Sequence, residues 1–237
     1  MSKACRVLLL RWVAAGIALM GAQAVATGAP GAVVELFTSQ GCSSCPPADA
    51  IAGRLTTNPS VIVLSFHINY WDELGWKDPF SSQVSTDRQY AYARVLEERS
   101  VFTPQVVVNG MQSVVGSQES AIEHAVETAN RAGFPVRADL SKQPDGGFAL
   151  SLQGAAIKAE VWEVRYVRYA ATQVRGGENG GRRLETYNNV TGLRRLGSFA
   201  PGTLSLPALK SPDDGLAVFV QAPGTGRMLG AVAYQGG

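Results

Sequence analysis

The sequence predicts an α/β domain followed by a mostly β, sandwich-like domain, and two observations support this division. Residues 30–133 alternate short apolar runs with amphipathic segments, as strands do when they alternate with helices. Residues 136–237 contain short segments of alternating polarity separated by turns rich in glycine and proline, which is typical of a β-sandwich. Residues 134–135, Phe-Pro, form the predicted linker.

In the first domain the predicted elements follow the order βαβαββα. The strands at 32–38 and 61–67 are almost entirely apolar, as buried parallel strands are. The helix at 46–57 begins with two prolines, which a first turn tolerates because its N–H groups lack helical partners. After a long loop, the remaining elements are a helix at 86–99, strands at 105–108 and 111–115 joined by an Asn-Gly turn, and a helix at 117–131.

The second domain contains seven segments with strand-like alternation. Turns that combine proline, aspartate and glycine separate several of them. The predicted strands are 136–140, 147–152, 160–169, 184–191, 202–206, 216–221 and 228–234.

The first 26 residues have the pattern of a secretory signal peptide. Lys3, Arg6 and Arg11 precede a short apolar stretch at residues 12–20, and small residues follow as cleavage candidates. Because the stretch is short for a membrane span, we expect none after cleavage; an uncleaved N-terminal anchor is the alternative. The mature protein is therefore expected to be periplasmic or secreted.

The charge of the chain excludes several classes of partner. It has 21 Lys and Arg against 19 Asp and Glu, and 18 against 19 without the three basic residues of the leader. A nearly neutral mature chain gives no reason to expect nucleic acid or anionic membranes as partners.

Cys42 and Cys45 stand just before the helix predicted at 46–57 and are the main candidates for chemistry. Export would place them in an oxidising compartment, where a disulfide persists. A disulfide across so short a loop constrains the unfolded chain little, so stabilisation of the fold is a weak explanation for the cysteine pair. The positive end of the helix dipole favours a thiolate, and we therefore expect Cys42 to attack and Cys45 to resolve.

The strand, the Cys42–Cys45 pair and the helix, followed later by Thr103–Pro104 before a strand and by an Asn-Gly hairpin, resemble the thioredoxin pattern. The resemblance implies a thioredoxin-like first domain. It also implies that Pro104 is a cis-proline that lies against the cysteines and, with Thr103, binds substrate. An ordinary trans proline is the alternative, since cis bonds are rare.

Longer stretches resemble an exported family known as domain of unknown function 1223. The resemblance covers nearly the whole mature chain and implies a thioredoxin-like domain with a β-rich partner, but no particular substrate. The stretches are residues 33–49, 65–72, 75–80, 102–105 and 177–182, the last with an extra glycine before the usual form.

Glu35 is the candidate proton acceptor for Cys45. Ordinary thioredoxins carry a buried acid before the cysteine pair, but Glu35 is one residue out of that register, and one residue reverses the face of a strand. A salt-bridged carboxylate is the alternative. The tryptophan that usually precedes the first cysteine is replaced here by Gln40 and Gly41.

His67 ends the second predicted strand and leads into an aromatic loop. Because strand ends in open α/β sheets border the binding crevice, His67 is a candidate copper or zinc ligand together with Cys42 and Cys45. A hydrogen-bonded loop histidine is the alternative. Tyr70 and Trp71 are expected to contact substrate, or instead to pack between the two domains.

The sequence therefore predicts an exported thiol–disulfide oxidoreductase that acts on protein or small-molecule thiols through Cys42 and Cys45. It would need an unidentified redox partner and no organic cofactor. A periplasmic copper-binding chaperone that uses both cysteines and His67 is the first alternative. A non-enzymatic binding module with a resting disulfide is the second.

Overall fold

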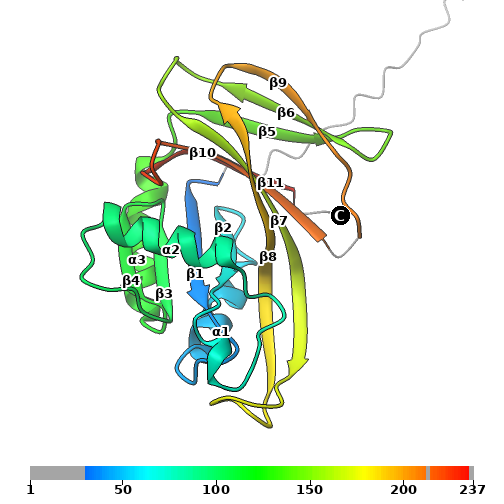
Figure 1. Cartoon of the computed structure of the whole chain (residues 1–237). Helices are drawn as coiled ribbons and strands as arrows, with labels where there is room; N and C mark the ends of the chain where they lie inside the picture. Colours follow the sequence, from blue (N-terminus) through cyan, green and yellow to red (C-terminus); the bar gives the residue numbers. More distant parts are fainter. Residues whose placement is uncertain (1–29, 212–213, 235–237) are drawn as a thin grey trace, which may run out of the picture.

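A computed structural model describes residues 30–211 and 214–234 (Figure 1), so the predicted signal peptide at 1–26 lies outside the described residues. The first half contains β1 (Ala32–Thr38), α1 (Pro46–Leu55), β2 (Val61–His67), the 3-10 helix η1 (Asp72–Leu74), α2 (Gln83–Val95), β3 (Gln105–Val108), β4 (Gln112–Val115) and α3 (Glu119–Ala132). The second half contains β5 (Arg137–Lys142), β6 (Phe148–Gln153), β7 (Glu160–Gln173), β8 (Arg183–Ser198), β9 (Gly202–Leu206), β10 (Asp214–Gln221) and β11 (Met228–Tyr234).

Strands from both halves of the chain form one mixed sheet. Its eight strands follow the order β11-β10-β7-β8-β2-β1-β3-β4, and β5, β6 and β9 form a second sheet. The halves meet where β8 runs parallel to β2, with Ser65 opposite Asn189. The predicted fold class, a thioredoxin-like α/β domain followed by a sandwich-like β domain, is therefore wrong: the described residues are mostly β, with three α-helices. The division into two domains at the linker 134–135 stays a prediction.

The pairing of β8 with β2 is the physical reason for this difference, because alternating polarity does not specify which strand is the partner. The sequence pattern predicts strands that end at residues 169 and 191, whereas β7 has 14 residues and β8 has 16. β8 meets β2 at Asn189, which lies within the predicted strand, and this pairing covers backbone groups at the edge of β2. Asn188 strengthens the junction, because its Nδ2 donates to the carbonyl of Val63 at 2.8 Å.

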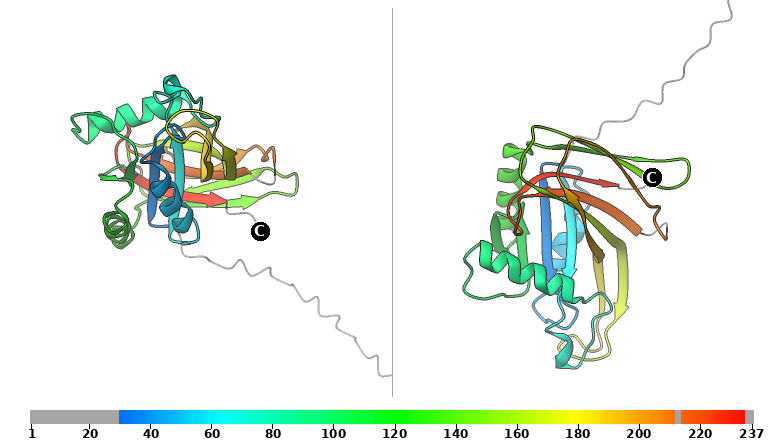
Figure 2. Two further views of the ribbon diagram at one scale, coloured as in Figure 1. Left: turned by 90° about the horizontal axis from the view of Figure 1, so that it is seen from below. Right: turned by 45° about the horizontal axis from the view of Figure 1, so that its top comes forward.

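Helices cover both faces of the central strands (Figure 1, Figure 2). Val34 and Leu36 of β1 belong to the buried cluster that includes α1 and α3, whereas Val33 and Phe37 belong to the cluster that includes Tyr92 of α2. Successive side chains of a strand point to opposite faces. Both faces of β1 are therefore buried, which explains why the strand lacks the polar alternation of a half-exposed one.

The main sheet is strongly curled, so its far strands return over the α2 side of the core. Phe219 of β10 and Met228 of β11 share a buried cluster with Phe37 and Tyr92. The amide of Met228 also donates to the carbonyl of Asn109 at 2.8 Å, which joins β11 to the β3–β4 turn. The curl therefore closes the core around β1, β2 and α2.

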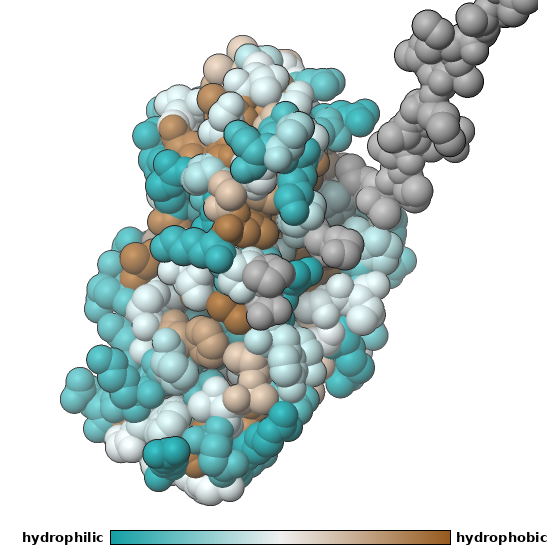
Figure 3. All heavy atoms as spheres, turned by 90° about the vertical axis from the view of Figure 1, so that its right-hand side faces the viewer, coloured by the Kyte–Doolittle hydropathy of each residue, from teal (hydrophilic) through white to brown (hydrophobic). Residues whose placement is uncertain are grey.

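The surface carries no extended hydrophobic area on the face that Figure 3 shows, where hydrophobic atoms gather in small patches between hydrophilic ones. Within the part of the chain that the structure describes, no helix is long and apolar enough to cross a membrane. The exposed large apolar side chains are spread over many elements and are Leu74, Val84, Tyr90, Val95, Met111, Val115, Tyr169 and Leu204.

A buried ion pair joins β1 to α2. Arg88 Nε donates to Glu35 Oε1 at 2.5 Å, and the Tyr92 hydroxyl donates to the other carboxylate oxygen of Glu35. Arg88 Nη2 also donates to Gln221 Oε1 of β10 at 3.1 Å. The guanidinium lies 5.5 Å from the ring centre of Phe66, so aromatic rings surround the charge as well.

Replacing Arg88 with Met should lower the free energy of unfolding by about 3–5 kcal/mol, because it leaves the Glu35 carboxylate buried without a cation. Urea denaturation followed by circular dichroism measures this change. The control is Arg54→Met, which breaks the exposed ion pair with Glu119 and should cost less than about 1 kcal/mol. Equal stability of the two variants would contradict a structural role for the buried pair.

Candidate functional site

Cys42 and Cys45 form a disulfide between the end of β1 and the start of α1. The S–S distance is 2.17 Å and the Cα atoms are 5.4 Å apart. Cys45 is the N-cap residue of α1, and its carbonyl accepts from the amide of Ala48 at 2.9 Å. Prolines follow at the first helical positions, where they remove no helical hydrogen bond. The pair predicted from the sequence is thus closed at a helix N-terminus.

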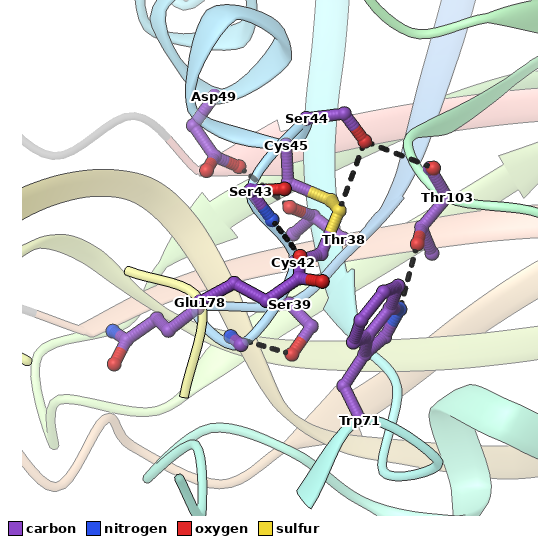
Figure 4. Close-up of a disulfide and its surroundings, with 12 residues drawn as sticks. Thr38, Ser39, Cys42, Ser43, Ser44, Cys45, Asp49, Trp71, Thr103 and Glu178 are labelled. Atoms are coloured by element: carbon purple, nitrogen blue, oxygen red, sulfur yellow. Dashed lines mark hydrogen bonds between the residues drawn. A yellow bond between two sulfur atoms is a disulfide. The ribbon is translucent and has the colours of Figure 1, made fainter. Parts of the chain in front are cut away.

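Cys42 and Cys45 are both fully buried. The loop between β7 and β8 helps to bury them. Asn179 Nδ2 donates to the carbonyls of Cys42 at 2.8 Å and of Gln40 at 3.0 Å. Glu178 Oε2 accepts from the amide of Ser43 at 2.9 Å (Figure 4). The second half of the chain therefore holds the backbone of the cysteine loop in place.

Glycine residues allow the β7–β8 loop to approach the loop after β2 closely. A Cβ atom on Gly176 would lie 2.3 Å from the carbonyl oxygen of Gly75, which is too close for any side chain. Gly75 and Gly177 have positive φ angles of 95° and 64°, a conformation that glycine adopts without strain. The glycine-rich stretch at 176–181 thus lets the β7–β8 loop pack directly on the loop after β2.

Thr103 and Trp71 lie beside the disulfide (Figure 4). The Thr103–Pro104 peptide bond is cis. Ser44 Oγ lies 3.3 Å from Cys42 Sγ and donates to the Thr103 carbonyl at 3.5 Å. Trp71 Nε1 donates to the Thr103 hydroxyl at 2.8 Å (Figure 4). These contacts link the cysteine loop to the residues predicted to bind substrate.

Tyr70 points to α2 rather than to the sulfur atoms, because its hydroxyl donates to Gln89 Oε1 at 3.1 Å. Burial raises the pKa of Tyr70 to about 12, so the hydroxyl stays protonated at neutral pH. A role for Tyr70 in substrate binding stays a prediction.

His67 is fully buried and uses both ring nitrogens in hydrogen bonds. Nδ1 lies 2.7 Å from Asp78 Oδ2, and Nε2 lies 2.8 Å from Asn189 Oδ1 of β8. Because a carboxylate oxygen only accepts, Nδ1 carries a proton. Burial would lower the pKa of His67, but attraction to Asp78 and these hydrogen bonds raise it.

The metal site predicted from Cys42, Cys45 and His67 is not formed. Both ring nitrogens of His67 are in hydrogen bonds, and the cysteine sulfurs are bonded to each other. The described residues contain no group of three His, Cys, Asp or Glu side chains that could hold a metal ion. In the structure, His67 is a hydrogen-bonded histidine, which was the alternative interpretation.

Glu35 does not face the disulfide as a free carboxylate. Both of its oxygens accept hydrogen bonds, one from Arg88 and the other from Tyr92. The salt-bridged alternative considered for Glu35 is therefore present, and the one-residue offset in β1 explains why, because it turns Glu35 to the α2 face.

Asp49 is the acidic residue that the sequence analysis missed. It lies in the first turn of α1, is 4% exposed, and accepts from the Thr38 hydroxyl at 2.9 Å. Burial raises its pKa to about 7, although attraction to His67 and the Thr38 hydrogen bond oppose the shift. In sequence, Asp49 resembles an ordinary acidic residue at a helix N-terminus; its four-residue spacing from Cys45 was the available signal.

Comparison with solved structures supports the fold described above. Protein AGR_C_4864 from Agrobacterium tumefaciens is similar with a TM-score of 0.79 and 31% sequence identity, over 89% of this chain and 96% of that chain. HBP35 of Porphyromonas gingivalis is similar with a TM-score of 0.61 and 15% identity, over 88% of this chain and 76% of that chain. The second likeness concerns the fold alone, and neither structure is described as a thioredoxin.

Comparison with protein families confirms the resemblance carried by the sequence motifs. No curated protein matches the chain. The family described as "Protein of unknown function (DUF1223)" matches residues 33–221, which is most of the chain. The protein therefore belongs to the DUF1223 family.

Proposed function

We propose that this protein is an exported thiol–disulfide oxidoreductase that exchanges disulfides through Cys42 and Cys45. The observation that carries the proposal is the closed disulfide at the N-terminus of α1, linked through Ser44 to the cis Thr103–Pro104 peptide. A helix N-terminus stabilises a thiolate, and the Ser44 hydroxyl is placed to donate to Cys42 Sγ once the disulfide opens. The expectation of export comes from the first 26 residues alone.

The proposed exchange takes two successive thiol–disulfide steps. A substrate thiolate attacks Cys42 Sγ, a mixed disulfide forms, and the Cys42–Cys45 bond breaks with Cys45 as the leaving thiolate. A second substrate thiolate then attacks the substrate sulfur of the mixed disulfide and releases Cys42 as a thiolate. Two electrons pass from the substrate dithiol to the protein; the reverse sequence reduces a substrate disulfide. A partner of the thiol–disulfide class resets the pair.

The burial of both sulfurs favours a second candidate, a binding module whose disulfide stays closed. Asn179 and Glu178 hold the backbone of the cysteine loop, so a substrate thiolate reaches Cys42 only when this contact opens. The two candidates differ in one measurable property, the turnover of the disulfide.

Exchange activity should depend on each cysteine in a different way. Cys42→Ser should abolish reduction of a fluorescent disulfide peptide by the reduced protein, because the attacking sulfur is lost. Cys45→Ser should accumulate a mixed disulfide with the peptide, detectable by mass spectrometry, because no resolving thiol remains. Ser205→Ala, at an exposed residue of β9, is the control and should keep full activity. A wild-type protein without turnover would favour the binding module.

Loosening the β7–β8 loop should expose the disulfide. Asn179→Ala removes two hydrogen bonds to the cysteine loop, which together are worth roughly 1–3 kcal/mol. The rate of reduction by dithiothreitol should therefore rise on the order of 10-fold if opening limits access. The control is Asp145→Ala, which removes a comparable hydrogen bond, to the Gly147 amide, in the distant β5–β6 turn. An unchanged rate in Asn179→Ala would show that the loop does not restrict access.

A further inference from the structure

The burial of Cys45 creates a requirement for a proton. When the disulfide opens, Cys45 leaves as a thiolate in a site from which water is excluded, and an unpaired buried charge is costly. When the disulfide closes again, the Cys45 thiol must lose its proton before its sulfur attacks. A group that exchanges a proton near neutral pH is therefore needed next to Cys45.

Asp49 lies where such a group is needed. It follows Cys45 by four residues, and residues at this spacing occupy the same face of a helix. The amide of Asp49 donates to the Cys45 carbonyl at 3.1 Å, and the close-up view shows the Asp49 side chain beside Cys45 (Figure 4). Among residues 30–211 and 214–234, Thr38 is the side chain that donates to this carboxylate.

The neighbouring carboxylates contact basic side chains directly, unlike Asp49. Asp78 pairs with His67, and the amide of Gln40 donates to the same oxygen of Asp78 at 2.7 Å. Glu35 pairs with Arg88 on the other face of β1. Asp49 bonds to a hydroxyl and has no cation in direct contact, so its protonation state is free to change.

The charges that face Asp49 come from β2 and from the loop that follows it. His67 attracts the Asp49 carboxylate and Asp78 repels it, while burial favours the neutral acid. These effects bring the pKa of Asp49 to about 7, close to the range in which proton transfer at neutral pH is efficient. Asn189 of β8 fixes His67 from the opposite side of its ring.

We propose that Asp49 transfers the proton of Cys45: it protonates the Cys45 sulfur when the disulfide opens and removes that proton when the disulfide closes. The proton passes between the carboxyl group and the sulfur, so no co-reactant beyond the thiol or disulfide substrate is required. The proposal rests on the exchange reaction proposed above. His67 and Asp78 are positioning residues for it, because they set the charge around Asp49.

Asp49→Asn tests the proposal while keeping an oxygen that accepts from Thr38. Because acid–base catalysis contributes typically 10²- to 10⁴-fold, closure of the reduced protein by a small disulfide should slow on the order of 100-fold at pH 7. The wild-type rate should rise with pH as the Asp49 carboxylate forms, with a midpoint below that of a variant that lacks this carboxylate. In Asp49→Asn this rise should move to the higher pKa of a free thiol, roughly 8.5.

Two control variants separate proton transfer from a structural effect. Asp87→Asn replaces an exposed aspartate of α2 and should change neither the rate nor the pH profile. Asp49→Glu keeps the carboxylate and should retain an inflection below that of the Asn variant. If the wild type exchanges disulfides and Asp49→Asn has the same rate and pH profile, the inference fails while the proposed function stands. If the wild type does not exchange at all, both fail.

A measurement on the wild type keeps the test decisive if Asp49→Asn does not fold. Carboxyl NMR titration of Asp49 should give different pKa values in the reduced and the oxidised protein, because Asp49 is coupled to a titrating Cys45 thiol only in the reduced protein. Equal pKa values in the two redox states would overturn the proposal.

Discussion

Burial of the Arg88 guanidinium is the interaction on which the rest of the structure depends. Glu35 of β1, Tyr92 of α2 and Gln221 of β10 all hydrogen-bond within this network. A buried charge is tolerated only when its partners are in place, so these three elements must dock together. This requirement couples the position of α2 to the curl of the sheet, which returns β10 over β1. The surrounding rings exclude water and strengthen the attraction between the charges.

The curl also decides which residues surround the disulfide. Because β8 pairs with β2, the β7–β8 hairpin runs past the end of the sheet and its loop reaches the cysteines. Asn179 then binds the carbonyl of Cys42, and Asn189 binds His67. Residues more than a hundred positions away in the sequence thus complete the site. The disulfide belongs to the first half of the chain, but residues of the second half hold the backbone around it.

Three buried carboxylates near the core show how environment assigns different roles to the same chemical group. Glu35 contacts Arg88 and Asp78 contacts His67, so both carboxylates have a basic partner. Asp49 has the Thr38 hydroxyl instead, and burial raises its pKa to about 7. Carboxylates in such contrasting surroundings commonly divide structural and proton-transfer roles. The arrangement links the charge state of the site to residues at the ends of β1 and β2.

The sequence by itself determined the local structure: the order of the elements, the Cys42–Cys45 pair and the place of Thr103–Pro104. These features depend on hydrophobic periodicity, turn residues and spacing along the chain, all of which act over short distances. Only the tertiary structure decided the fold class and the roles of Glu35, His67 and Asp49. Alternating polarity specifies which face of a strand is buried, but it does not specify the partner strand. The pairing of β8 with β2 and the partners of each buried charge arise from contacts between distant segments, which no local pattern encodes.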